Sequence, residues 1–225
     1  MEETKSRELE KWESAKNMMA EDYKPLTFGP YFSHIIRRSP RRLLHLLSYY
    51  KFAAKMIGND KKVMDVGCSE GFGSVILAEF AREFVGVDID AAAISHAQGS
   101  LGSAKVSFKH ADFLKADLGV FDAVTCFDVI EHIYPENEDT FLSRITAHLN
   151  SDGMAVVGTP SITSDQFASP WTKEGHVNLY SGERLKTSLE RHFKKVVIFS
   201  ANDEVVHTGF WPMAHYLIGV GMFKK

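Results

Sequence analysis

Residues 63–73, Val-Met-Asp-Val-Gly-Cys-Ser-Glu-Gly-Phe-Gly, indicate a short buried strand that runs directly into a glycine-rich turn. A helical stretch follows at 74–82. Glycines at such a turn permit unusual dihedral angles and let backbone N–H groups approach a ligand closely. A tight loop without a ligand has the same local pattern, so the surrounding sequence must decide between the two.

Outward from this turn, short apolar runs alternate with helical stretches. Strand and helix alternating at this spacing predict a parallel sheet covered on both faces, and the right-handed crossover rule makes it a doubly wound α/β fold. The predicted strands are 63–66, 84–87, 106–109, 123–127 and 155–158, and the helices between them are 74–82, 91–98 and 139–149. A further helix at 182–192 and two β-like runs, 195–199 and 216–223, follow.

Three acidic residues stand at the ends of successive predicted strands. Asp88 comes 23 positions after Asp65, where a carboxylate can accept hydrogen bonds from both hydroxyls of a ribose. Asp112 ends the third strand, where it can accept from the exocyclic amine of adenine, and Phe113 can lie against the ring. The series predicts a cofactor that carries adenosine.

The turn also favours one cofactor over another. A dinucleotide site uses Gly-x-Gly-x-x-Gly, whereas the glycines here are Gly67, Gly71 and Gly73. Asp65 at the mouth and Glu70 within the turn would repel a pyrophosphate. A sulfonium cofactor with an α-amino group is cationic at those points. We therefore expect S-adenosylmethionine rather than NAD.

Four segments together resemble the class I, Rossmann-like S-adenosylmethionine-dependent methyltransferases, and are closest in motif to ubiquinone-biosynthesis-type O-methyltransferases. They are residues 63–73, Val-Gly-Val-Asp-Ile-Asp at 85–90, His-Ala-Asp-Phe at 110–113 and Phe-Asp-Ala-Val-Thr-Cys-Phe-Asp-Val-Ile-Glu-His-Ile at 121–133. The resemblance covers about residues 58–160. It implies a mostly parallel seven-stranded sheet of order 3-2-1-4-5-7-6 with the last strand antiparallel, completed by 195–199 and 216–223. Ser69 departs from the family, where many members have glycine.

The resemblance also implies roles for single residues. The amino-acid end of the cofactor would lie on Asp65, Gly67 and Gly71, with Cys68 between them. The ribose and adenine would lie on Asp88, Ile89, Asp112 and Phe113. Phe127 and Asp128 would end the fourth strand beneath the methyl group.

The candidate catalytic residues are Glu131, His132 and His176. Methyl transfer needs the nucleophile held in line, and a hydroxyl acceptor also benefits from a base. If a helix begins at Asp128, then Asp128, Glu131 and His132 share one of its faces, and His176 on the later loop could fold over the same mouth. These four residues are also candidates for a divalent metal site, similar to that of metal-assisted O-methyltransferases, including small-RNA 2′-O-methyltransferases. The alternative is that they only pack or cap the helix.

The remainder of the chain bears on the acceptor. We expect residues 1–57 to form a helical cap that contains the acceptor region, and residues 58–225 to form the cofactor-binding domain. The basic run Arg37-Arg38-Ser39-Pro40-Arg41-Arg42 could recognise a phosphate-bearing acceptor, or could be a solvated helix face. The polar segment 161–180 shows no periodicity and is expected to be a functional loop.

Bulk properties narrow the classes of partner. With 225 residues and a net charge of −3, the chain has no general basic field, and we do not expect nucleic acid as its partner. The two cysteines form no disulfide framework and favour a reducing cytoplasm. No apolar run approaches the ~18 residues of a membrane span.

These features predict a methyltransferase that acts on an oxygen of a small molecule or of a sugar- or nucleotide-linked precursor, with S-adenosylhomocysteine as the product. The alternatives are a possibly metal-assisted RNA methyltransferase, a non-catalytic cofactor-binding subunit and an NAD-dependent enzyme. The sequence leaves the oligomeric state open.

Overall fold

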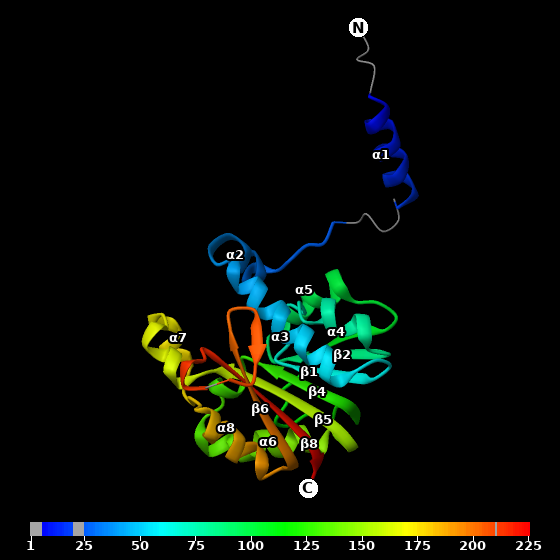
Figure 1. Ribbon diagram of the computed structural model, residues 1–225. Coiled ribbons are helices and arrows are strands. Elements are labelled where there is room, and N and C mark those ends of the chain that lie inside the picture. Colours follow the sequence, from blue (N-terminus) through cyan, green and yellow to red (C-terminus); the bar gives the residue numbers. More distant parts are fainter. Residues whose placement is uncertain (1–5, 20–24, 210) are drawn as a thin grey trace.

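A computed structural model describes residues 6–19, 25–209 and 211–225. One eight-stranded sheet in the order β3-β2-β1-β4-β5-β8-β6-β7 runs through it (Figure 1). Its strands are β1 (Lys62–Val66), β2 (Glu83–Asp88), β3 (Val106–His110), β4 (Phe121–Phe127), β5 (Leu149–Pro160), β6 (Phe193–Asn202), β7 (Val205–His207) and β8 (Tyr216–Lys224).

The sheet confirms the predicted α/β topology. Strands β1 to β5 pair in parallel, and β8 is antiparallel to both β5 and β6, which reproduces the order 3-2-1-4-5-7-6 when β8 is counted as the seventh strand. The eighth strand, β7, is an unpredicted three-residue edge that pairs with β6 after a tight turn. Asp203 in that turn has a φ of 51°.

Helices cover both faces of the sheet (Figure 1). One core lies between the sheet and α3, α4 and α5, and includes Tyr50, Leu77 and Ile94. The other lies between the sheet and α6 and α8, and includes Phe141 and Leu185. The longer helices are α1 (Arg7–Met18), α2 (Pro30–Arg38), α3 (Arg41–Ile57), α4 (Ser74–Phe80), α5 (Ala91–Leu101), α6 (Glu138–Ala147), α7 (Pro170–Gly175) and α8 (Gly182–Glu190). The described helices include none that is both long and apolar enough to cross a membrane.

The N-terminal region contains a helix, α2, whose bounds the sequence does not predict, because Gly29 and Pro30 at its start are typical of a break between helices. Pro30 occupies the start of α2, where a missing N–H costs nothing. The Glu70 carboxylate accepts hydrogen bonds from Tyr31 N at 2.9 Å and Phe32 N at 3.0 Å, and so caps α2 from the glycine-rich turn. Helix α1 has no buried residue. Helix α3 shares a core with the sheet, and a domain boundary at residues 57–58 stays a prediction.

The segment after β5 is also more ordered than expected. It contains a 3-10 helix, η3 (Ile162–Phe167), and the α-helix α7. Their first turns are capped by the hydroxyls of Ser161 and Ser169, which accept from Thr163 N and Thr172 N. Elements of one or two turns show no periodicity in sequence, which is why 161–180 was expected to be a loop.

Candidate functional site

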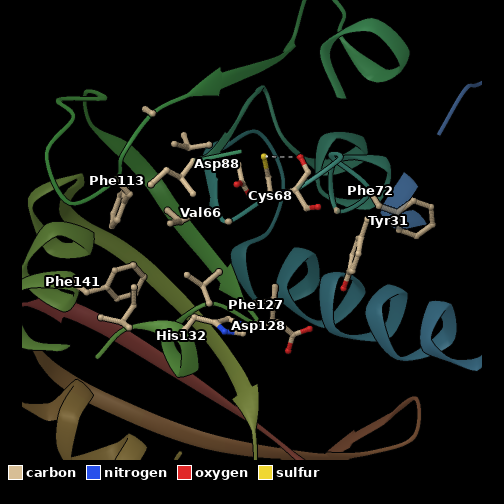
Figure 2. Close-up of a pocket in the computed structure, with 18 of the residues that line it drawn as sticks. Tyr31, Val66, Cys68, Phe72, Asp88, Phe113, Phe127, Asp128, His132 and Phe141 are labelled. Carbon is tan, nitrogen blue, oxygen red and sulfur yellow. Dashed lines mark hydrogen bonds between the residues drawn. The ribbon is translucent and has the colours of Figure 1, made fainter. Parts of the chain in front are cut away.

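A cavity of about 430 Å³ opens at the carboxyl ends of β1, β2 and β4. In Figure 2, Phe113 and Phe141 lie at one end of it, Tyr31 and Phe72 at the other, and Asp88 and Asp128 at its wall. Most of the residues predicted to hold the cofactor line this cavity: Gly67, Cys68, Asp88, Ile89, Asp112, Phe113, Phe127 and Asp128. Asp65 and Gly71 are not among the described lining residues. Tyr31, Tyr50 and Phe72 line it too and were not assigned to the cofactor from the sequence.

The glycine-rich turn requires its glycines for steric reasons. Gly67 has a φ of +74°, and a Cβ there would lie 2.1 Å from Cγ2 of Val129. Gly71 has a φ of +80°, and its Cβ would lie 2.6 Å from the ring of Phe108. Ser69 also takes a positive φ, 49°, so the residue that departs from the family pattern keeps a left-handed backbone conformation that favours glycine.

Asp88 connects this turn to the next strand. Its Oδ2 accepts from Ser69 N at 2.8 Å and its Oδ1 accepts from Asp90 N at 2.9 Å. A carboxylate oxygen can accept two hydrogen bonds, so each oxygen keeps acceptor capacity for a ligand. Asp112, across the cavity, accepts from Leu114 N at 3.0 Å and pairs with Lys115 at 2.8 Å. The hydrogen bond from Lys115 lowers the pKa of Asp112, which therefore stays ionised at neutral pH.

The acidic mouth expected from Asp65 and Glu70 is wrong. Glu70 is turned away to cap α2. Asp65 is fully buried, and its carboxylate accepts from Thr125 Oγ1 at 2.6 Å and from Tyr50 Oη at 3.1 Å. Burial raises the pKa of Asp65 to about 7, against the lowering effect of those two hydrogen bonds. The carboxylates that do line the cavity are Asp88, Asp112 and Asp128.

The raised pKa of Asp65 predicts a pH-dependent stability. Between about pH 4 and pH 7 the unfolded chain releases a proton that the folded chain keeps, so the free energy of unfolding falls as pH rises. Asp65→Asn removes this titration. Its stability relative to wild type should therefore rise between pH 5 and pH 8 by about 3 kcal/mol, since about two pH units of that range lie below the folded pKa and one unit corresponds to about 1.4 kcal/mol. Urea unfolding at both pH values measures the change, with D117N at an exposed aspartate as control. An equal difference at both pH values would contradict a raised pKa.

A second cavity of about 310 Å³ adjoins the first and shares Asp128 and His132 with it. The predicted catalytic residues Glu131 and His176 line this second cavity. Ligand atoms of Glu131, His132 and His176 lie within 4.8 Å of one another. The structure thus brings together residues that are more than 40 positions apart in sequence. The expected helix from Asp128 is instead a 3-10 turn, η1 (Ile130–His132), and Asp128 precedes it with a φ of 56°.

Glu131 is the buried member of this cluster. Its side chain is fully enclosed, and its Oε2 accepts from Thr159 Oγ1 at 3.0 Å. Its Oε1 has no hydrogen-bond partner among the described residues. Burial, and then the nearby Asp128 carboxylate, raise the pKa of Glu131 to about 8. A buried carboxylate with a free oxygen is expected to face a ligand or a reacting group.

The two histidines are oriented differently. His132 Nδ1 lies 2.8 Å from the carbonyl oxygen of Gly175, which makes Nδ1 the protonated nitrogen and leaves Nε2 as an acceptor. The His132 and His176 rings lie 5.0 Å apart between centroids. Burial, and then His132, lower the pKa of His176, so that its imidazole is neutral at pH 7.

A buried network holds the segment that carries His176. The Glu131 carbonyl accepts from Val177 N at 2.9 Å and Asn178 N at 3.0 Å. Asn178 and Tyr180 in turn donate to the Glu138 carboxylate, at 3.3 Å and 2.6 Å. These contacts tie the segment after α7 to both η1 and α6. No sequence motif marked Glu138 or Asn178 in advance, because their roles depend on tertiary contacts.

The Glu131 cluster fits a divalent cation. Its donors are a carboxylate oxygen without a partner and imidazole nitrogens, and first-row divalent metals accept such a set. The Gly175 carbonyl accepts from His132 Nδ1 and so orients the ring with Nε2 available to a metal ion. Asp128 lines the same cavity but lies outside the group of three.

Comparison with known proteins agrees with this fold and cavity. The sequence profile of a family described as a methyltransferase domain matches residues 57–197. A probable S-adenosylmethionine-dependent methyltransferase of Mycolicibacterium smegmatis is 30% identical over 119 residues, 52% of this chain and 44% of that protein. A ubiquinone biosynthesis O-methyltransferase of Rickettsia felis is 27% identical over 146 residues, 60% of this chain and 56% of that protein.

Solved structures show the same fold. The 1,6-didemethyltoxoflavin-N1-methyltransferase of Burkholderia thailandensis, with S-adenosylhomocysteine bound, superposes with a TM-score of 0.63 over 100% of this chain and 94% of that one, at 16% identity. The chain belongs to the methyltransferase-domain family. It spans less than half the length of the Mycolicibacterium relative.

Proposed function

We propose that this chain transfers the methyl group of S-adenosylmethionine to a hydroxyl oxygen of a small-molecule acceptor. The cofactor would occupy the cavity lined by Asp88, Asp112 and Phe113, with its methyl group towards Asp128. The observation that carries the proposal is the junction of the two cavities, where the cofactor wall ends at Asp128 and His132 and the Glu131 cluster begins.

The residues at this junction supply what an O-methyl transfer needs. The acceptor oxygen attacks the methyl carbon, the carbon–sulfur bond breaks, and S-adenosylhomocysteine is the leaving group. The acceptor proton passes to a neutral imidazole, for which His176 is suited by its lowered pKa and His132 by its free Nε2. The Glu131 carboxyl group, whose Oε1 has no hydrogen-bond partner among the described residues, lies beside these two imidazoles.

Glu131, His132 and His176 would hold a divalent cation if the reaction uses one, and such an ion would lower the pKa of a bound acceptor hydroxyl. Metal analysis of the purified protein, with activity measured before and after chelation, tests this. Full activity in a metal-free sample would leave the histidines as the only bases.

Cys68 and Cys126 are buried free thiols. They support the further proposal of a cytoplasmic location, where thiols stay reduced.

The proposed activity is tested with S-adenosylmethionine carrying a labelled methyl group. The acceptors are hydroxylated small molecules, among them phenols, sugars and sugar phosphates, with matched amines and an RNA oligonucleotide as separate arms. Label on a hydroxyl compound that requires the protein is the expected result. Label only on amines, or only on RNA, would overturn the assignment to a small-molecule hydroxyl.

A further inference from the structure

A third cavity, of about 390 Å³, lies beside the two already described. It shares Asp128 with both of them, and Arg42, Pro160 and Ser164 with the second. Asp128 is therefore the point where all three meet. A molecule in the third cavity can reach the junction at which the methyl transfer is proposed.

Basic groups dominate the wall that α3 gives to this cavity. Arg41, Arg42 and His45 line it from the first turns of α3. That first turn contains no acidic residue, and no side chain caps it. The N-terminal end of a helix carries a partial positive charge, which adds to the charge of the two guanidinium groups.

A second group of residues faces α3 across the cavity. The ring centroids of His215 and His45 lie 5.3 Å apart. A hydrogen bond of 3.1 Å joins His215 Nε2 to Tyr49 Oη. Tyr216 stacks on Tyr49 at 4.1 Å and is 3% exposed, and its hydroxyl has no hydrogen-bond partner among the described residues. Burial, and then the nearby Asp128 carboxylate, raise the pKa of the Tyr216 hydroxyl. The wall therefore offers several donors, among them this buried hydroxyl.

Two acidic groups of the described residues lie near these basic side chains: Asp128, which lines the cavity, and Asp203, which is not among its described lining residues. Asp128 lies 3.9 Å from Arg42, and Asp203 lies 3.5 Å from His45 with its side chain 81% exposed. Arg41 has no ion pair in the described part of the chain. The second cavity is less basic, because Arg42 is its one arginine and both Asp128 and Asp165 line it, whereas Arg41 and Arg42 face the single carboxylate Asp128 among the described residues that line the third. An anion would therefore be attracted more strongly to the third cavity than to the second.

The structure divides the basic run that the sequence singled out. Arg37 and Arg38 end α2 and line a separate small hollow with Pro30, Ser33 and His34. Arg41 and Arg42 begin α3 beside the third cavity. Ser39 and Pro40 separate the two pairs. Two arginine pairs of the same charge, adjacent in sequence, thus have different surroundings.

We propose that the third cavity binds a phosphate monoester group of the methyl acceptor, held by Arg41, Arg42 and His45 with Tyr216 and His215 opposite. This inference rests on the proposed function and narrows its substrate class to a phosphorylated hydroxy compound. The phosphate lies in the third cavity and the hydroxyl at the junction beside Asp128. Arginine forks match the oxygens of a phosphate, and the lone hydroxyl of Tyr216 supplies a further donor.

The test is calorimetric titration of the full chain, with and without S-adenosylhomocysteine. The probes are inorganic phosphate and glycerol 3-phosphate, and glycerol is the neutral control. Saturable binding of both phosphates and none of glycerol is expected. R41A/R42A should weaken phosphate binding at least 10-fold, and His45→Gln about 3-fold. The control variant R37A/R38A also removes two arginine charges, but these lie outside the third cavity. It should change the affinity for phosphate less than 2-fold. Circular dichroism melting confirms that each variant folds.

Equal weakening by the two double variants, or no saturable phosphate binding, would overturn the subsite. Binding of a 5′-phosphorylated oligonucleotide but not of glycerol 3-phosphate would replace the small-molecule class with RNA. The titration of S-adenosylhomocysteine keeps the two proposals apart. Normal binding of that compound without phosphate binding removes the subsite alone, whereas its failure to bind removes the proposed function and leaves the phosphate result to stand separately.

Discussion

Asp88→Ala is expected to weaken the binding of S-adenosylhomocysteine by about 100-fold or more. The Asp88 carboxylate lines the cofactor cavity and keeps acceptor capacity on both oxygens, which fits the two hydroxyls of a ribose. Hydrogen bonds to a charged group contribute about 1.5–3 kcal/mol each, so losing two of them accounts for this factor. The same carboxylate accepts from Ser69 N, so the variant also loosens the glycine-rich turn, which is proposed to hold the amino-acid end of the cofactor.

The matched control is Asp90→Ala, two positions away. Asp90 caps α5 by accepting from Ala92 N and Ala93 N, and it does not line the cavity among the described residues. Its loss should cost about 1 kcal/mol of stability and leave the affinity within 2-fold. Calorimetry gives both affinities. Unchanged affinity in D88A would show that the ribose lies elsewhere.

Glu131→Gln is expected to lower the rate of methyl transfer by about 100-fold, in line with the usual contribution of an acid–base group, while the affinity for S-adenosylhomocysteine stays within 2-fold. Glu131 lines the second cavity and not the first, so its chemistry is separable from cofactor binding. Glutamine preserves the shape of the side chain and can still accept from Thr159, but it removes the carboxyl group that can exchange a proton beside His132 and His176.

Glu136→Gln is the control, because Glu136 is exposed in the turn before α6 and lines neither cavity among the described residues. Rates are measured with the acceptor that the labelled-methyl screen identifies. Full activity in E131Q would remove Glu131 from the reaction, and loss of cofactor affinity would show a structural defect instead.

Local sequence patterns predicted most of the strands and helices of the fold. The strands from Val63 to Gly158 and the helices between them follow from apolar runs alternating with helical periodicity, and the antiparallel end of the sheet followed from family resemblance. Strand β7, the short helices η3 and α7 and the bounds of helix α2 were not predicted. Helix α2 depends on Glu70, which caps it from 38 positions away, β7 is too short to show an alternation, and η3 and α7 are too short to show helical periodicity.

The site was predictable where residues follow strands, because the carboxyl ends of parallel strands meet at one edge. Asp88, Asp112 and Asp128 all line the first cavity, and their contacts with the cofactor stay a prediction. The prediction of an acidic mouth formed by Glu70 and Asp65 was wrong, because both carboxylates accept hydrogen bonds from groups that are distant in sequence. The third cavity could not be predicted from the sequence for a related reason. Tyr49 and His215 are brought together only by the packing of α3 on the end of the sheet.

Binding of the cofactor by the isolated chain tests the central claim most directly. Calorimetric titration with S-adenosylhomocysteine and S-adenosylmethionine, alongside NAD⁺ under the same conditions, is the measurement. The account predicts saturable one-to-one binding of both adenosyl compounds and no binding of NAD⁺. Binding of NAD⁺ with neither adenosyl compound bound would contradict it.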